Sequence, residues 1–501
     1  MSAQLKTKVI RGFAWNTAEK IASALFQAWV VVNVTNRLYP DQYALKAIFA
    51  AFVVVFNTFV DSGFSQALIR NKNATPTDHS SAFWFNIAVA TVVYGLLVGL
   101  SYPTARILDM PEFVRFAPVF FLVVPLGALG IIQQTVLTRE FDFRRLSTIT
   151  FVSIVISGLV AVALAFAGFG FWAIVGQRVM QTGTRSALLW IFGRWKPQAK
   201  FSGGAIRTMF GYSSRLLGTD LLNNIYNSVP QFIIGHIHSG TLGNYEQARS
   251  IRDLPVNSTM NAMQSVTFPA LAAVSGDGKK FVRGVGKVVG SIVFLMFPMM
   301  AGLIAVADEL FGVFLASQWQ PSVLFFRILC LAGFATPLAI ISSNILRTRS
   351  DGKAVIRAEI IKKVLATVIL AATIPFGALA ITWGVVGIAF TDAAVSFATA
   401  RRHSDYGVGL LVRDVLPTLA LTLVMAAAVW GVGLLLSGAS FVAAISASPK
   451  LALGIILAAK IMTGVAVYLG GAALLGLDAF REFTELLRKI ISGARPTSGC
   501  G

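Results

Sequence analysis

The sequence predicts an all-α polytopic membrane protein with about fourteen transmembrane helices, for three reasons. First, the chain of 501 residues is 56% hydrophobic and only 13% charged, whereas soluble domains carry roughly 25% charged residues. Second, apolar segments long enough to cross a bilayer recur along the whole chain. Third, the basic residues gather in alternate connections between these segments, as they do in membrane proteins of defined orientation.

The expected spans follow one another with short connections, so the chain leaves no room for a large domain between them. They are residues 13–34, 44–67, 82–101, 114–137, 149–167, 170–192, 209–236, 241–273, 284–306, 322–346, 355–376, 379–399, 414–437 and 450–476. Each is close to the 20 or so residues that a helix needs to cross the hydrocarbon core.

The basic residues divide the connections into two kinds. One side holds Arg70, Lys72, Arg139, Arg144, Arg145, Arg194, Lys196, Lys200, Arg207, Lys279, Lys280, Arg283, Lys287, Arg347, Arg349, Lys353, Arg357, Lys362, Lys363, Arg401, Arg402 and Arg413. The other side holds only Arg37, Arg106, Arg115 and Lys450. This bias predicts a multi-pass membrane protein with both termini in the cytoplasm. The net charge of +20 follows from this topology and from attraction to lipid headgroups, so no nucleic-acid partner is expected.

An internal repeat predicts how the spans are grouped. Pro125, Leu137, Thr138, Arg139, Trp172 and Gly176 match Pro337, Leu346, Thr348, Arg349, Trp383 and Gly387 at an offset near 210 residues. Six spans per repeat is an even number, so both halves enter the membrane in the same direction. We therefore expect two parallel six-helix bundles, 1–200 and 201–405, related by a pseudo-two-fold axis along the membrane normal. Two additional transmembrane helices in 406–477 and a cytoplasmic amphipathic tail in 478–501 complete the chain.

Polar side chains form stripes on three of the expected spans. The seventh span carries Asp220, Asn223, Asn224, Asn227 and Gln231, the eighth carries Glu246, Arg249, Asp253, Asn257, Asn261 and Gln264, and the first carries Asn16 and Gln27. Their spacing of three, four, seven and eleven residues places most members of each stripe on one helix face. Polar groups at membrane depth normally face a bundle interior or a water-filled cavity. The stripes therefore predict a hydrophilic chamber.

The chemistry of these side chains suggests their roles. Amides both donate and accept hydrogen bonds, and an arginine can make two parallel hydrogen bonds to an anionic group. We expect Asn16, Gln27, Asn223, Asn224, Asn227, Gln231 and Asn257 to contact substrate, together with Arg178, Arg185, Arg215, Arg249 and Arg252. Asp220, Glu246 and Asp253 are the candidates for coupling to a proton or sodium gradient, since a buried acid can titrate near neutral pH. The alternative is structural: Arg249 and Arg252 form fixed ion pairs with Glu246 and Asp253.

Several local motifs resemble a known family. They are Asp61–Asn73, Phe83–Asn86, Thr138–Arg145, Ile233–Gly235, Leu242–Tyr245, Leu254–Asn257 and Phe268–Leu271. Together they are similar to Wzx-type polysaccharide or O-antigen flippases of the colanic-acid-exporter branch, in the multidrug/oligosaccharidyl-lipid/polysaccharide exporter superfamily. The resemblance covers roughly residues 10–350. One departure is Pro230, which stands where the family often has an aspartate, so a shared acidic coupling residue is in doubt.

The resemblance implies a secondary-active flippase that works by alternating access. It would move undecaprenyl-pyrophosphate-linked oligosaccharide repeat units from the cytoplasmic to the periplasmic leaflet, for exopolysaccharide, capsule or O-antigen assembly. The implied partners are that lipid-linked substrate, an ion gradient, membrane lipids, and the polymerase and chain-length machinery that use the product. Two alternatives stay open: a multidrug-type cation exporter, and a membrane polysaccharide polymerase or ligase. The spacing of histidines, cysteines and acids predicts no metal site, no cofactor and no catalytic residue, so we expect a transporter and not an enzyme.

Overall fold

The structure is a computed structural model that describes residues 19, 22–61, 63–71, 73–140, 142–193, 195–237, 239–273, 277–349, 353–437, 449–481 and 484. Every regular element in these ranges is a helix, and the chain divides into two compact units, Met1–Glu246 and Gln247–Gly501. The predicted all-α fold is confirmed.

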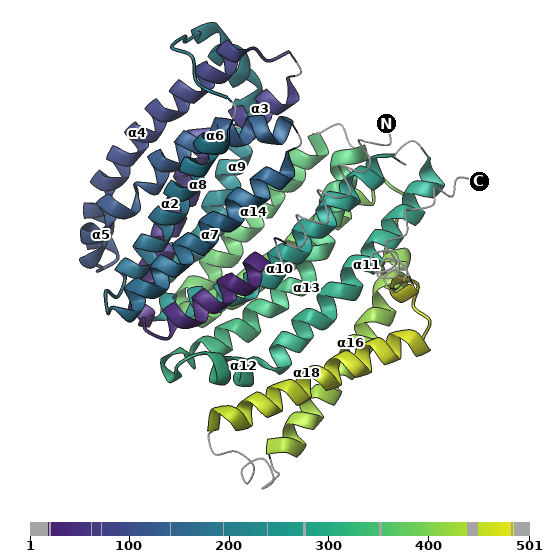
Figure 1. Cartoon of the computed structure of the whole chain (residues 1–501). Helices are drawn as coiled ribbons and strands as arrows, with labels where there is room; N and C mark the ends of the chain where they lie inside the picture. The colour runs from purple at the N-terminus through teal and green to yellow at the C-terminus, as the bar shows by residue number, and fades with distance from the viewer. Residues whose placement is uncertain are drawn as a thin grey trace. The chain divides into compact units, whose positions relative to one another are not determined.

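The first unit begins with a helix at Ala22–Thr35. It continues with α2 (Pro40–Asp61), α3 (Phe64–Arg70), α4 (Pro76–Ile107), α5 (Glu112–Phe120), α6 (Val123–Arg139), α7 (Phe143–Phe166), α8 (Trp172–Phe192) and α9 (Gly203–Ile237). Within this unit α6 and α7 pack against α8, and α2 packs against α9; α4, α6 and α8 run alongside one another (Figure 1). Its core includes a group of aromatic rings around Phe49, which stacks on Phe113 at 4.0 Å and on Phe120 at 4.6 Å between ring centroids.

The second unit receives the later part of α10 (Ser239–Ala273), which begins in the first unit. It continues with α11 (Gly278–Ala305), α12 (Ala307–Phe314), η1 (Ser317–Trp319), α13 (Ser322–Arg349), α14 (Lys353–Thr373), η2 (Ile374–Phe376), α15 (Gly377–Ala400), α16 (Val408–Ser437) and α18 (Pro449–Leu474). Here α13 and α14 pack against α15, while α16 packs between α11 and α18. In Figure 1, α16 and α18 lie side by side at the yellow end of the chain.

Several helices begin with local signals that the sequence carries. α4 starts with a capping box, in which the Thr75 hydroxyl accepts from the Asp78 backbone N–H at 3.2 Å and the Asp78 carboxylate accepts from the Thr75 N–H at 2.8 Å. Pro76 at the first helical position completes this start. Asp142 and Asp277 cap α7 and α11 with their carboxylates, which accept from the backbone N–H groups of Arg145 and Lys280. The hydrogen bonds that Asp277 accepts from Lys280 lower the pKa of its carboxyl group.

A second polar contact orders the connection between α15 and α16. The buried Tyr406 donates a hydrogen bond of 2.8 Å from its hydroxyl to Asp414 Oδ2. Burial, and then the bond to Asp414, raise the pKa of Tyr406 well above its ordinary value. The phenol therefore remains a hydrogen-bond donor at any physiological pH.

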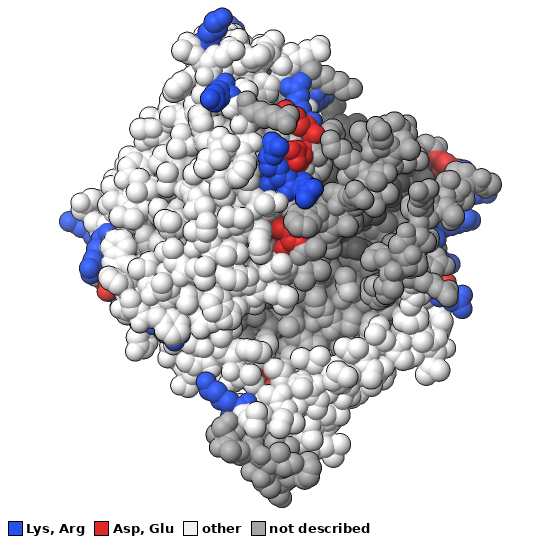
Figure 2. All heavy atoms as spheres, viewed as in Figure 1, with Lys and Arg blue, Asp and Glu red and all other residues white. Residues whose placement is uncertain are grey.

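Hydropathy separates the long helices into two groups. Among the described residues, nine helical stretches are long and apolar enough to cross a membrane, one of them being the continuous stretch Ala354–Ala400 that contains α14 and α15. The face of the molecule in Figure 2 agrees, because charged side chains are few and most of its described surface is uncharged. The chain is thus a multi-pass membrane protein. Three long helices, α8, α9 and α10, do not qualify because they are too polar.

Each of the fourteen expected spans overlaps a helix in the described part of the chain. The number of membrane crossings and the two-fold relation between bundles stay predictions. The expected bundle boundary near residue 200 differs from the division into compact units, which falls within α10 because α9 packs on α2, α3 and α4. The assignment of whole spans to bundles, and the role of 406–477 as additional transmembrane helices, also stay predictions. Most of the expected amphipathic tail, 478–501, lies outside the described residues.

Candidate functional site

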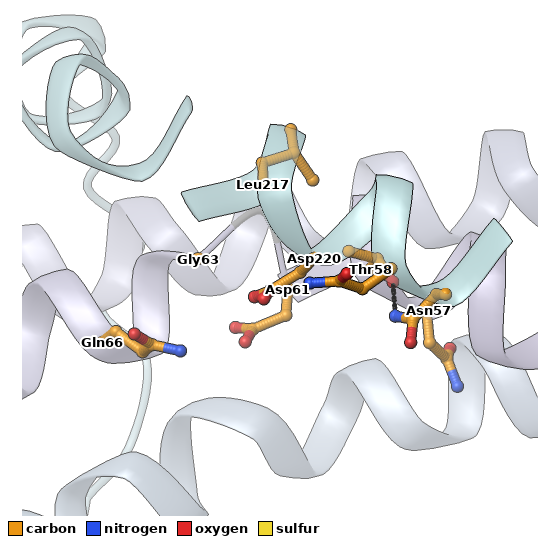
Figure 3. A pocket seen from close by; sticks show the side chains of 9 residues that line it. Asn57, Thr58, Asp61, Gly63, Gln66, Leu217 and Asp220 are labelled. Carbon is orange, nitrogen blue, oxygen red and sulfur yellow. Dashed lines mark hydrogen bonds between the residues drawn. The ribbon is translucent and has the colours of Figure 1, made fainter. Parts of the chain in front are cut away.

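A polar cavity of about 350 Å³ opens in the first unit, between the end of α2, the start of α3 and the middle of α9. Its lining consists of Asn57, Thr58, Asp61, Gly63, Gln66, Leu217, Asp220, Asn223 and Asn224. Seven of these nine residues have polar side chains, and Figure 3 shows the Asp61 and Asp220 carboxyl groups directed toward the same space. The cavity thus joins the predicted stripe of the seventh span to a wall from the second span.

Local hydrogen bonds hold both walls of the cavity in place. Asn224 Nδ2 donates to Thr58 Oγ1 at 2.8 Å, the dashed line in Figure 3, and Thr58 in turn donates to the Val54 carbonyl at 3.0 Å. Asp61, the last residue of α2, accepts from the Ser65 hydroxyl at 2.6 Å and from the Ser65 backbone N–H at 3.4 Å, which connects it to the first turn of α3. Gly63 allows the sharp turn between these helices with a φ of 71°, a conformation that other residues rarely adopt.

A second group of polar residues lies further along the same helices. Glu246 on α10 is buried and accepts a hydrogen bond of 3.1 Å from Gln231 Nε2 on α9. Its carboxylate lies close enough to Lys46 on α2 and Arg178 on α8 to attract both cations electrostatically. Lys46 and Arg178 also repel each other. Four helices thus contribute to one cluster with two formal positive charges and one negative charge, which we call the cationic cluster (Lys46, Arg178, Gln231 and Glu246).

Aromatic and hydroxyl groups support the Lys46 side of the cationic cluster. The Lys46 ammonium lies 4.5 Å from the centroid of the Tyr43 ring, within the range of a cation–π contact. The Tyr43 hydroxyl is hydrogen-bonded to the buried Thr35 of the preceding helix. These contacts restrict the Lys46 side chain on its Tyr43 side.

The charged residues that were expected on α10 belong to two separate groups. Glu246 belongs to the cationic cluster, whereas Arg249 and Arg252 share Asp253, with Nε–Oδ distances of 3.5 and 3.0 Å. Asp253 therefore has the ion pairs that the structural alternative expected. Arg252 and Asp253 also lie near the buried Cys330 of α13. A substrate role for these two arginines and a coupling role for Asp253 stay predictions.

The remaining predicted residues are distributed over several helices. Arg185 donates from Nη2 to Gln134 Oε1 at 3.0 Å, which connects α8 to α6. Asn227 and Asn257 are exposed, and Gln27 is partly buried on the helix 22–35. Asn16 and the side chain of Arg215 lie outside the described residues. The structure thus brings Asp220, Asn223 and Asn224 to the cavity, and Arg178, Gln231 and Glu246 to the cationic cluster.

The sequence did not indicate that the second span contributes to both the cavity and the cationic cluster. Lys46, Asn57, Thr58 and Gln66 were not among the expected site residues. A lysine inside an apolar span was the available signal for Lys46. For the cavity, the signal was that Asn57, Thr58 and Asp61 recur at helical spacing immediately before the motif Asp61–Asn73.

Comparison with known sequences gives a consistent set of similarities. Residues 36–324, more than half of the chain, match the family described as "Polysaccharide biosynthesis protein". The chain is 24% identical to the succinoglycan biosynthesis transport protein ExoT of Rhizobium meliloti (strain 1021), over 66% of this chain and 67% of that protein. It is 22% identical to the lipopolysaccharide biosynthesis protein WzxC of Escherichia coli (strain K12), over 66% and 68% of the two chains.

Comparison with solved structures identifies the fold. The lipid II flippase MurJ in an inward closed conformation is similar with a TM-score of 0.70 and 14% identity, over 94% of this chain and 99% of that chain. A multidrug resistance transporter of the MATE family in an inward-facing conformation is similar with a TM-score of 0.62 and 13% identity, over 77% and 97% of the two chains. The fold is therefore that of polytopic membrane transporters.

Proposed function

Since the chain belongs to the family of polysaccharide biosynthesis proteins, we propose that it is a flippase for lipid-linked oligosaccharides. Its substrate is an oligosaccharide repeat unit on undecaprenyl pyrophosphate, which it moves from the cytoplasmic to the periplasmic leaflet of the bacterial inner membrane. Two similar proteins support this class: ExoT is a transport protein of succinoglycan biosynthesis, and MurJ, which shares the fold, is a flippase.

The cationic cluster is the observation that carries this proposal. Moving a pyrophosphate through hydrocarbon without compensation costs many kcal/mol, because the charged group loses its hydration. Lys46 and Arg178 can replace that hydration with charge-assisted hydrogen bonds, and the arginine can bind phosphate oxygens with two parallel bonds. The net positive charge of the cluster favours an anionic headgroup over the cationic drugs of a multidrug exporter.

The acidic residues suggest how transport is driven. Glu246 attracts the two cations that would bind the pyrophosphate, so the substrate and the Glu246 carboxylate compete for the same partners. Protonation of Glu246 would then favour substrate binding, and we propose it as a coupling residue together with Asp220 and Asp253. In this proposal both termini lie in the cytoplasm, and the flipped repeat unit passes to a polymerase, while the flippase itself performs no chemistry on the sugar.

A liposome assay with the purified full chain tests the proposal. The substrate is an undecaprenyl-diphosphate oligosaccharide with a fluorophore on its sugar, and dithionite outside the vesicles bleaches only the outer leaflet. We expect Lys46→Met and Arg178→Met each to slow flipping by about 10-fold or more, since a hydrogen bond to a charged group contributes about 1.5–3 kcal/mol. Lys46→Arg and Arg178→Lys should retain part of the rate, because they keep the charge.

The control variant is Arg115→Gln, which removes an exposed cation at the start of α5 that belongs neither to the cavity lining nor to the cationic cluster. It should flip the substrate at the wild-type rate. If vesicles with the wild-type chain lost no more fluorescence than vesicles without protein, the proposed function would be contradicted. Normal flipping by both methionine variants would instead show that the anionic group binds elsewhere.

A further inference from the structure

The cavity differs in charge from the cationic cluster. Among its nine lining residues, Asp61 and Asp220 are acidic, and none is a lysine or an arginine. The other polar side chains of the lining are neutral: Thr58 and four amides, Asn57 on α2, Gln66 on α3, and Asn223 and Asn224 on α9. A phosphate or carboxylate in this space would meet like charges, so the cavity is unsuited to the anionic part of a substrate.

The carboxylate of Asp61 has an oxygen available to a ligand. Both hydrogen bonds that the structure shows for this side chain, from the Ser65 hydroxyl at 2.6 Å and the Ser65 N–H at 3.4 Å, end on Oδ1. Among the described residues no hydrogen bond ends on Oδ2, and Figure 3 shows the carboxyl group pointing toward the cavity. An ionised carboxylate only accepts hydrogen bonds, so it suits a ligand that donates them.

The size of the cavity indicates a ligand larger than a bare cation. Its volume of about 350 Å³ corresponds to roughly a dozen water molecules at about 30 Å³ each. It lies at the lower end of the range of small-molecule sites, about 300–1,000 Å³. The combination of carboxylates, amides and one threonine hydroxyl matches the donor and acceptor pattern of sugar hydroxyls.

The cavity also lies at a suitable distance from the cationic cluster. Asn57 follows Lys46 by eleven residues on α2, and Gln231 follows Asp220 by eleven residues on α9. At 1.5 Å per residue, the cavity and the cationic cluster are therefore ~16 Å apart along the axes of both helices. A short oligosaccharide attached to a pyrophosphate can extend over such a distance.

We propose that the cavity is a subsite for an uncharged sugar residue of the transported headgroup, and that Asp61 and Asp220 select against sugars with acidic substituents. This inference rests on the proposed flippase function. It adds a substrate class: repeat units whose sugars at this position carry free hydroxyl groups and no carboxylate or phosphate.

The test compares two headgroups in the full-length protein. One undecaprenyl-diphosphate trisaccharide is neutral, and the other ends in glucuronate; binding is measured in lipid nanodiscs and flipping in liposomes. We expect the wild-type chain to prefer the neutral headgroup by roughly 10-fold, because like charges about 4 Å apart in a partly hydrated cavity change binding by about that factor or more. Asp61→Asn with Asp220→Asn should bring the ratio close to one.

The variants are chosen to separate charge from folding. The substitution Asp61→Asn keeps a side-chain oxygen that can accept from Ser65, so the contact with the first turn of α3 is preserved. If the double variant does not fold, the same ratio is measured with Asp220→Asn alone. Glu112→Gln, which removes an exposed acid at the start of α5, should leave the ratio unchanged. A wild-type ratio of one, or a ratio that the double variant leaves unchanged, overturns the subsite. Preferential binding of the neutral headgroup without flipping would overturn the flippase function and leave the subsite standing.

Discussion

Gly243 shows how a single residue permits two helices to meet. It lies near the start of α10, beside the start of α2, and a Cβ atom added there would come within 1.8 Å of the Pro40 carbonyl oxygen. The atoms in the way belong to the backbone, so no side-chain rotation can relieve the overlap. Only glycine fits this close approach. The contact also positions Glu246, which follows one helical turn later in the cationic cluster.

We therefore expect Gly243→Ala to destabilise the protein by about 3 kcal/mol or more, since overpacking against immobile atoms costs at least 1–3 kcal/mol. The measurement is the midpoint of thermal unfolding in detergent. Gly211→Ala in α9 is the matched control, because a Cβ there meets nothing within 4 Å. It should be neutral or slightly stabilising, as alanine favours helix by up to about 1 kcal/mol. Equal midpoints for the two variants would show that α2 and α10 do not approach each other as closely as described.

At the scale of elements, α18 is joined to the rest of its unit by buried polar contacts. Lys460 Nζ lies 2.5 Å from Glu309 Oε1 on α12 and 3.2 Å from the Ala305 carbonyl oxygen, and both charged side chains are almost fully buried. Gly433 on α16 leaves the space through which the lysine stem passes. A hydrogen bond of 2.7 Å from the Tyr468 hydroxyl to the Phe294 carbonyl oxygen adds a second contact, to α11.

We expect Lys460→Met to destabilise the protein by about 3–5 kcal/mol, because it leaves the Glu309 carboxylate buried without its counter-ion. The double variant Lys460→Met, Glu309→Leu should recover most of that loss, since an apolar pair of similar size can replace a buried ion pair. The midpoint of thermal unfolding in detergent again measures the effect. Lys280→Met, in the exposed pair with Asp277, should leave the midpoint nearly unchanged, because exposed ion pairs contribute little to stability. A double variant no more stable than the single one would show that the ion pair itself is required.

At the scale of the whole molecule, orientation in the membrane follows from the basic connections. The expected topology places the end of α16 outside and the connection between α15 and α16, which includes Arg401 and Arg402, in the cytoplasm. After Cys330 and Cys500 are replaced by serine, a cysteine at Ser437 should react with a membrane-impermeant thiol reagent added to intact cells. A cysteine at Ser404 should react only after the membrane is permeabilised. The reverse pattern would contradict the orientation, and labelling of both positions would contradict the predicted span between them.

The sequence by itself determined the fold class, because hydropathy and helical periodicity are local properties that each segment carries alone. It also identified Asp220, Asn223 and Asn224 as one polar face, since residues three and four apart on a helix must share a side. Only the tertiary structure decided which faces meet. Lys46 lies near Arg178 and Glu246, and Asp61 lies across a cavity from Asp220, although these residues are far apart in the sequence. Such neighbours depend on how helices pack, and the spacing of residues within one helix contains no information about its partners.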